Sequence, residues 1–203
     1  MSSRWERIAV QTAGEDYATA YAERFRRLAA GGADVHGEAA FVAQLVPAPA
    51  RVLDAGCGTG RVAVRLHQLG YDVVGVDVDP TMVAVARAEA PDLDWRVADL
   101  ATMDLGSSFD LVVVAGNTIP LLEDGTLAAA CERLAAHTAP GGVVVTGFGL
   151  DAAHLPGDCP VTELSAVDAA MAAAGLEDAA HHGTWSGEPF DGGYVVAAYR
   201  RPS

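Results

Sequence analysis

The hydrophobic residues of this chain occur in short runs, separated by glycines and charged positions. From residue 51 onward, valine-rich runs such as 111–114 and 143–145 show no polar alternation. Continuous apolar runs of this length are typical of parallel strands that helices cover on both faces. The pattern predicts strands at 51–55, 72–77, 94–98, 109–115, 142–148, about 178–185 and 194–200.

Helical patterns fill the gaps between these strands. Asp79 and Pro80 form a favourable N-cap and first-turn pair for a helix that runs to residue 90. Gly175 suits the left-handed end of a helix that begins at Ser165. Two further helices are marked by apolar residues spaced by helical turns: Val62, Leu66 and Leu69, and then Leu127, Cys131 and Leu134.

The order of these elements predicts an α/β fold with a doubly wound, Rossmann-like, mostly parallel seven-stranded sheet. The last two strands are joined only by 187–193, which contains proline and glycines, so they are expected to form an antiparallel hairpin. Residues 1–47 have a helical pattern instead. We expect them to form an N-terminal helical lid on the domain of residues 48–203, within one structural unit.

Composition limits the partners of the chain. Its 13 basic and 27 acidic residues give a net charge of −14, which disfavours nucleic acid and anionic membrane surfaces. No apolar run approaches the roughly 20 residues of a membrane-spanning helix, and the N-terminus lacks a secretory signal pattern. The separated cysteines Cys57, Cys131 and Cys159 indicate reduced thiols. We therefore expect a cytoplasmic protein without a metal site.

The most informative segment is the glycine-rich turn after the first predicted strand. Gly56, Gly58 and Gly60 have the spacing GxGxG, and Arg61 occupies the position where a dinucleotide fingerprint requires its third glycine. Glycines at such a turn let the backbone bend sharply and approach a ligand. Asp77 ends the second strand, where a carboxylate can accept hydrogen bonds from both hydroxyls of a ribose.

Five successive segments extend this pattern over residues 50–150: VLDAGCGTGRVAVRL, VVGVDVDPTMVAVARA, RVADL, FDLVVVAGN and APGGVVVTGF. In order, they resemble the motifs of class I methyltransferases that use S-adenosylmethionine (SAM). The resemblance implies SAM as cofactor, with S-adenosylhomocysteine as product, and leaves the methyl acceptor open. It places fifteen residues at the cofactor: Asp54, Gly56, Cys57, Gly58, Gly60, Asp77, Val78, Met82, Asp99, Leu100, Ala115, Gly116, Asn117, Tyr17 and Tyr21.

Catalytic residues are harder to assign. Asn117 follows the fourth strand, where it would either orient a substrate or cap the next helix. The segment lacks the [DN]PPY motif of DNA and protein-amide amino methyltransferases. His154, after the fifth strand, is the best placed of the histidines to act as a base, while His36 lies between two N-terminal helices. Tyr21 is a further candidate.

Tyr17, Tyr21, Phe25 and Leu28 form a stripe at helical spacing. This stripe either packs a helix onto the domain or closes a lid over the cofactor, and both roles are compatible. A lid over a compact site favours a small-molecule acceptor. The alternatives are a SAM-binding protein without turnover, a nicotinamide oxidoreductase and a nucleic-acid methyltransferase. The sequence does not distinguish a monomer from a homodimer.

Overall fold

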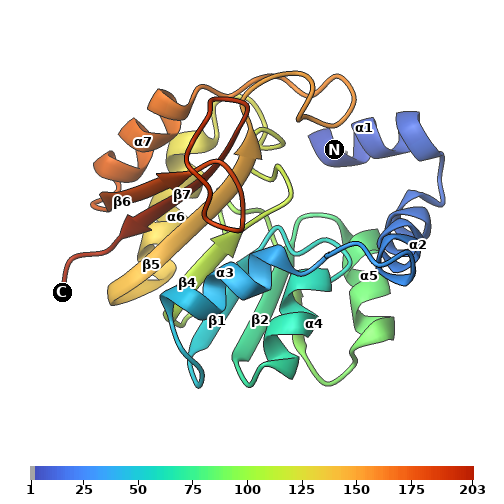
Figure 1. The fold of residues 1–203 in the computed structure, drawn as a ribbon, viewed down its shortest axis with the longest axis horizontal. Helices are drawn as coiled ribbons and strands as arrows, with labels where there is room; N and C mark the ends of the chain where they lie inside the picture. The colour runs from blue at the N-terminus through green and yellow to red at the C-terminus, as the bar shows by residue number, and fades with distance from the viewer. Residues whose placement is uncertain (1–2) are drawn as a thin grey trace.

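The computed structural model describes residues 3–203 as a seven-stranded sheet between two layers of helices (Figure 1). The strand order is β3-β2-β1-β4-β5-β7-β6, and β7 runs antiparallel to both of its neighbours, β5 and β6, while the other pairs are parallel. The strands are β1 (Arg51–Ala55), β2 (Asp72–Asp77), β3 (Asp94–Val97), β4 (Phe109–Val114), β5 (Thr138–Gly149), β6 (Glu177–His182) and β7 (Tyr194–Arg200). The helices are α1 (Arg4–Ala13), α2 (Tyr17–Ala30), α3 (Gly37–Leu45), α4 (Arg61–Gln68), α5 (Pro80–Glu89), α6 (Leu127–His137) and α7 (Leu164–Ala173).

The predicted doubly wound sheet and its C-terminal antiparallel hairpin are confirmed, while several strand boundaries differ. β5 starts at Thr138 rather than at 142, because Thr138 pairs with Phe109 ahead of a register shift. β6 ends at His182 rather than at 185, because the backbone N–H of Gly183 turns to bond the carbonyl of Glu188. β3 and β4 each end one residue earlier than predicted.

Two apolar cores lie on opposite faces of the sheet. Residues of α6 and α7 pack on one face, and residues of α3, α4 and α5 pack on the other. The expected stripe on α4 is partly wrong: Val62 and Leu66 are buried, whereas Leu69 follows the end of the helix and is exposed. Burial of both faces explains why the central strands are continuous valine runs.

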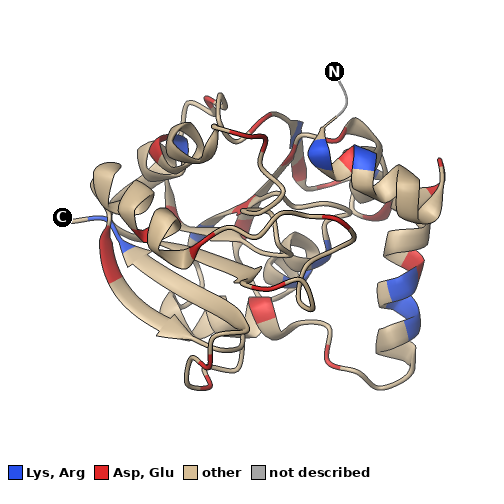
Figure 2. Ribbon diagram, turned by 90° about the horizontal axis from the view of Figure 1, so that it is seen from above, with Lys and Arg blue, Asp and Glu red and all other residues tan. Residues whose placement is uncertain are grey.

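Three helices precede the sheet, not the two expected from the sequence. α1 and α2 contact each other, α2 packs on α5, and α3 packs on α4. The stripe of α2 becomes more exposed along the helix: Tyr17 is 5% exposed, Tyr21 and Phe25 are partly buried, and Leu28 is 41% exposed. Residues 1 and 2, which the predicted lid included, lie outside the described residues. In Figure 2, basic and acidic positions lie close together on α1 and α2.

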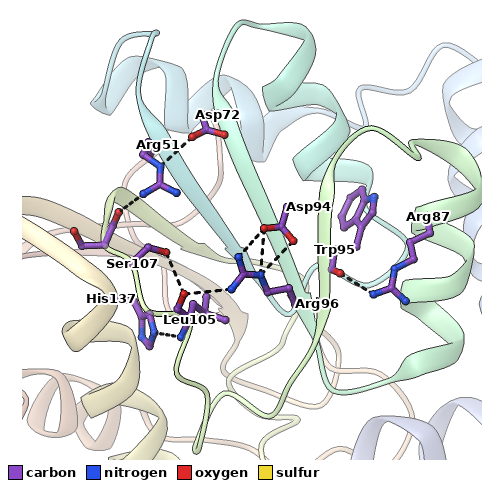
Figure 3. A network of polar contacts seen from close by, with 10 residues as sticks. Arg51, Asp72, Arg87, Asp94, Trp95, Arg96, Leu105, Ser107 and His137 are labelled. Carbon is purple, nitrogen blue, oxygen red and sulfur yellow. Dashed lines mark hydrogen bonds and ion pairs between the residues drawn. The ribbon is translucent and has the colours of Figure 1, made fainter.

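Polar contacts lie at the amino ends of β1 and β2, and between β3 and the loop before β4 (Figure 3). Arg51 at the start of β1 bonds Asp72 at the start of β2, at 2.9 Å. Arg96 of β3 bonds Asp94 and the carbonyl of Leu105. These contacts leave the carboxyl ends of the strands, at the opposite edge of the sheet, for ligand binding. Among residues 3–203, no helix combines the length and apolarity needed to cross a membrane.

Candidate active site

A cavity of about 390 Å³ opens at the carboxyl edge of the sheet. The chain proceeds from β1 outward to β3 and then returns to β4 beside β1, so this edge holds the topological switch point. Doubly wound folds bind their ligands at such a point. The loops after β1, β2, β3 and β4 all contribute to the cavity wall, and α1 and α2 complete it.

The glycine loop forms the floor of the cavity. Gly56 has a φ of +82°, and a Cβ on it would lie 2.4 Å from the hydroxyl oxygen of Thr118. The backbone N–H groups of Gly56 and Cys57 both donate to the carbonyl of Val76, at 2.8 and 2.9 Å. These bonds fasten the loop to β2. The lack of a Cβ therefore lets two loops meet closely beneath the cavity.

Asp77 is fixed on the cavity wall by two backbone donors. One carboxylate oxygen accepts from the N–H of Gly58 at 2.8 Å, and the other accepts from the N–H of Asp79 at 2.9 Å. Its side chain is nearly buried, and that burial raises the pKa of Asp77 to about 6, against the lowering effect of these bonds. Each oxygen keeps acceptor capacity for a ligand, because a carboxylate has about four lone-pair sites.

Asp54 lies deeper, at the end of β1. One of its oxygens accepts from the backbone N–H of Ala63 at 3.0 Å, in the first turn of α4. Burial raises the pKa of Asp54 to about 7, against the lowering effects of that hydrogen bond and of Arg61. A buried carboxylate with a raised pKa is poised to bind a cationic group, whose charge would offset the desolvation.

The N-terminal helices form the other wall. Trp5 and Arg7 of α1 and Tyr21 of α2 face the loop after β4, which contributes Leu122 and Glu123. Arg7 is paired with Glu123 at 3.2 Å, so α1 bridges the cavity from one side to the other. Burial raises the pKa of Tyr21, so its hydroxyl keeps its proton near neutral pH.

Most residues that the family resemblance placed at the cofactor line this cavity. They are Asp54, Gly56, Cys57, Gly58, Asp77, Val78, Met82, Asp99, Leu100, Ala115, Gly116 and Tyr21.

Three of the expected residues lie elsewhere. Tyr17 donates its hydroxyl proton to Asp79 at 2.5 Å and is buried away from the cavity. Gly60 faces β3, where an added Cβ would meet the ring of Trp95. Asn117 uses its side chain on the backbone, accepting from the N–H of Gly149 and donating to a carbonyl oxygen of the following loop.

The candidate base His154 is also outside the cavity wall. Its Nδ1 lies 2.8 Å from a carboxylate oxygen of Asp151, and its carbonyl accepts from the side chain of Asn117. In this structure the side chain of Asn117 is engaged by the backbone, and its roles in substrate orientation and helix capping stay predictions. Asn117 ties the loop after β4 to the loop after β5.

Sequence reasoning missed the remaining residues of the cavity wall. The cavity is also lined by Ser3, Trp5, Arg7, Thr59, Arg61, Val62, Thr118, Leu121, Leu122 and Glu123. The residues after β4 could have been predicted from the topology, because every loop at the carboxyl edge borders the switch point. Those of α1 could not, since nothing in the sequence fixes where that helix crosses the sheet.

These residues fit SAM. The nearly buried Asp77 matches a ribose, Asp54 matches an ammonium group, and the apolar side chains of Met82 and Leu100 match the faces of a purine. The wall has more carboxylates than guanidinium groups, which suits a ligand that carries a sulfonium and an ammonium.

Comparison with known proteins supports the same cofactor. A methyltransferase domain model matches residues 52–142. A TehB-like SAM-dependent methyltransferase from Corynebacterium glutamicum is 31% identical in sequence and superimposes with a TM-score of 0.82, over 91% of this chain and 98% of that one. The chain belongs to the class I SAM-dependent methyltransferases.

Two further relatives of this methyltransferase have named substrates. A dTDP-3-amino-3,6-dideoxy-alpha-D-glucopyranose N,N-dimethyltransferase from Streptomyces fradiae is 38% identical over 136 residues, which are 64% of this chain and 53% of that enzyme. A SAM-bound amino pentose methyltransferase from Micromonospora echinaspora is 28% identical, with a TM-score of 0.70 over 88% of this chain and 96% of that one. The chain spans about half, or less, of the length of the curated relatives that it matches.

Proposed function

We propose that this methyltransferase transfers the methyl group of SAM to a small-molecule acceptor held between α1 and the loop after β4. The observation that carries the proposal is the position of Asp77, a carboxylate held by two backbone N–H groups at the rim of a glycine floor. When bound, SAM supplies an electrophilic methyl group on its sulfonium.

The protein's contribution is mainly binding and orientation. Asp77 would accept from the ribose hydroxyls, Asp99 from the adenine amine, and Met82 would pack against the purine. Gly116, at a φ of +69°, would let the backbone after β4 approach the sulfonium. Methyl transfer needs an in-line approach, and a shaped, largely dry site can supply much of the rate enhancement.

The acceptor side supports a small nucleophile. The ion pair of Arg7 with Glu123 closes the cavity near Trp5 and Leu122, which leaves a compact space. A nitrogen nucleophile is favoured by the two relatives that act on amino sugars. Tyr21, which remains protonated, orients such an acceptor through its hydroxyl and does not deprotonate it.

The test is isothermal titration with SAM and with S-adenosylhomocysteine, followed by a screen of small amines and alcohols for uptake of radiolabelled methyl groups. The expected result is micromolar binding of both nucleosides and transfer to a subset of amines. Binding without transfer to any acceptor would favour the alternative of a SAM-binding protein without turnover. Absence of binding to correctly folded protein would overturn the proposal.

A further inference from the structure

A second cavity, of about 220 Å³, lies between α2 and α4. On one side α4 contributes Arg61, Val64, Arg65 and Gln68, whose spacing places them on one face of that helix. Residues of α2 between 22 and 29 line the opposite side with the same spacing. No described residue of the loop after β4 lines this cavity, so it is separate from the acceptor side of the active site.

The wall of this second cavity is basic, although the chain as a whole has 27 acidic and 13 basic residues. Arg26, Arg61 and Arg65 line it, together with the acidic Glu89. Arg61 is paired with Glu38, and Arg26 of α2 is paired with Glu89 of α5. These pairs leave one positive charge in excess, that of Arg65. The cavity therefore favours a negatively charged ligand.

The guanidinium of Arg65 has donors available for such a ligand. Among residues 3–203 no carboxylate pairs with it, and its Nη1 donates to the side-chain oxygen of Gln68 at 3.3 Å. A guanidinium has five N–H donors, so this bond leaves most of them unused. Arg65 is partly buried, which reduces the screening of its charge by salt.

Two further polar groups on the wall lack hydrogen-bond partners within the described part of the chain. Thr59, at the end of the glycine loop, is only 5% exposed, and its hydroxyl is unpaired. His36 lies just before α3, and its Nδ1 is buried without a partner. Buried polar groups are normally paired, and a ligand in the cavity would supply both missing partners. A hydroxyl can donate, and so can Nδ1 in one tautomer of the imidazole.

We propose that this second cavity binds a phosphate group, either as free phosphate or as the monoester of a small metabolite. Its donors approach from different elements, with Arg65 on α4, His36 before α3 and Thr59 in the glycine loop. A carboxylate has two oxygens in one plane, which a single guanidinium satisfies. A phosphate group has three outer oxygens that are not in one plane with the phosphorus, so it accepts from several directions.

The experiment is a phosphorus-31 NMR titration of the protein with inorganic phosphate and with glycerol 3-phosphate, at constant ionic strength. We expect a Kd of about 1 mM or lower for at least one of the two probes. Tighter binding of glycerol 3-phosphate would assign the site to a monoester, and equal or tighter binding of inorganic phosphate would assign it to the free ion. Arg65→Gln should weaken binding about ten- to a hundred-fold, as expected for lost charge-assisted bonds.

Matched variants separate this site from diffuse surface charge. Arg27→Gln removes the same charge from α2, at a side chain that is 73% exposed and lines neither cavity, and it should leave the affinity unchanged. Glu89→Gln removes the carboxylate from the wall and should strengthen binding, about two- to five-fold. Circular dichroism checks that each variant is folded.

Equal weakening by Arg27→Gln and Arg65→Gln would reduce the effect to overall charge and overturn the inference. Absence of binding of both probes to folded wild-type protein would overturn it as well. Displacement of bound phosphate by saturating S-adenosylhomocysteine would place the phosphate in the larger cavity and have the same consequence. The proposed function fails separately, through absence of S-adenosylhomocysteine binding, which leaves the phosphate titration unaffected.

Discussion

At the scale of single residues, the site is organised around two carboxylates kept in an environment that does not favour their charge. Burial raises the pKa values of Asp54 and Asp77, and in each case the backbone supplies the opposing hydrogen bonds. Buried carboxylates of this kind reduce the stability of the free protein when they are ionised. A bound ligand that supplies hydrogen-bond donors or a positive charge offsets that cost. Raised pKa values of this kind are typical of groups that bind a ligand.

This argument predicts an unusual dependence of stability on pH. The pKa of Asp54 is about 7 in the folded state and near 3.8 in the unfolded state, so the folded state binds more protons between these values. The free energy of unfolding must then fall as the pH rises from 4 to 7. Asp54→Asn should flatten that slope and stabilise the free protein by roughly 2–4 kcal/mol at pH 8.

Urea unfolding of both proteins at pH 5 and at pH 8 provides the measurement. Asp110→Asn, at an exposed position in β4, serves as a control of equal charge change. An unchanged slope in Asp54→Asn would mean that Asp54 is ionised in the folded protein without cost.

The position of a residue could be predicted from the sequence where the order of strands determines which edge of the sheet it occupies. Asp77 follows from its place at the end of β2, 21 residues after Gly56, which brings both to one edge of a parallel sheet. The position of Tyr17 could not be predicted in this way. Its hydroxyl points at Asp79 because of how α2 is rotated against α5, a tertiary relation that helical spacing leaves undetermined.

At the scale of elements, α2 is attached to the domain by that same hydrogen bond. Asp79 also caps α5, because it accepts from the N–H of Thr81 at 2.8 Å. Tyr17→Phe should lower the free energy of unfolding by about 1.5–3 kcal/mol, since it leaves a buried carboxylate short of a partner. Chemical denaturation measures this loss. Tyr21→Phe is the control, because its hydroxyl has no partner among the described residues, and an equal loss in both variants would contradict the assignment.

α1 is attached both by apolar packing and by ion pairs, since Ile8 clusters with Leu155 and Cys159. Arg4 pairs with Asp124 at 2.5 Å, and Arg7 pairs with Glu123 at 3.2 Å, on the far side of the cavity. The Arg7–Glu123 pair is exposed on both sides, and such pairs contribute about 0.2–1 kcal/mol. We expect opening of α1 to govern cofactor exchange, with this pair contributing a small part of the barrier.

Glu123→Gln should accelerate the release of S-adenosylhomocysteine about two- to five-fold, the change that corresponds to such an ion pair. Added salt should accelerate release from wild-type protein in the same direction. Stopped-flow dissociation measures both effects. Glu132→Gln on the exposed surface of α6 is the control, and identical rates in all three proteins would show that α1 does not gate the site.

Helix and strand boundaries were predictable where capping residues mark them. The Asp79–Pro80 start of α5 and the left-handed Gly175 after α7 are both present as expected. The start of β5 could not be predicted, because Pro140 and the following glycines are typical of a turn. This segment belongs to the sheet because it pairs with β4.

At the scale of the whole molecule, connectivity determines where function lies. The order in which the chain adds strands to the sheet reverses between β1 and β4, which creates a crevice. The glycine loop and the loop after β4 border this crevice. The order of strands and helices in the sequence was sufficient to predict this architecture, because parallel crossovers permit few alternatives. The acceptor side depends on the path of α1, which no local pattern specifies.

The most direct test of the account is the affinity of S-adenosylhomocysteine for Asp77→Asn compared with Asp72→Asn. The two residues end and begin the same strand, but Asp72 lies on the exposed amino edge, 68% exposed in its ion pair with Arg51. We predict that Asp77→Asn weakens binding about ten- to a hundred-fold, and that Asp72→Asn leaves it unchanged. Equal affinity of the two folded variants would contradict the assignment of the ribose site and, with it, the central claim.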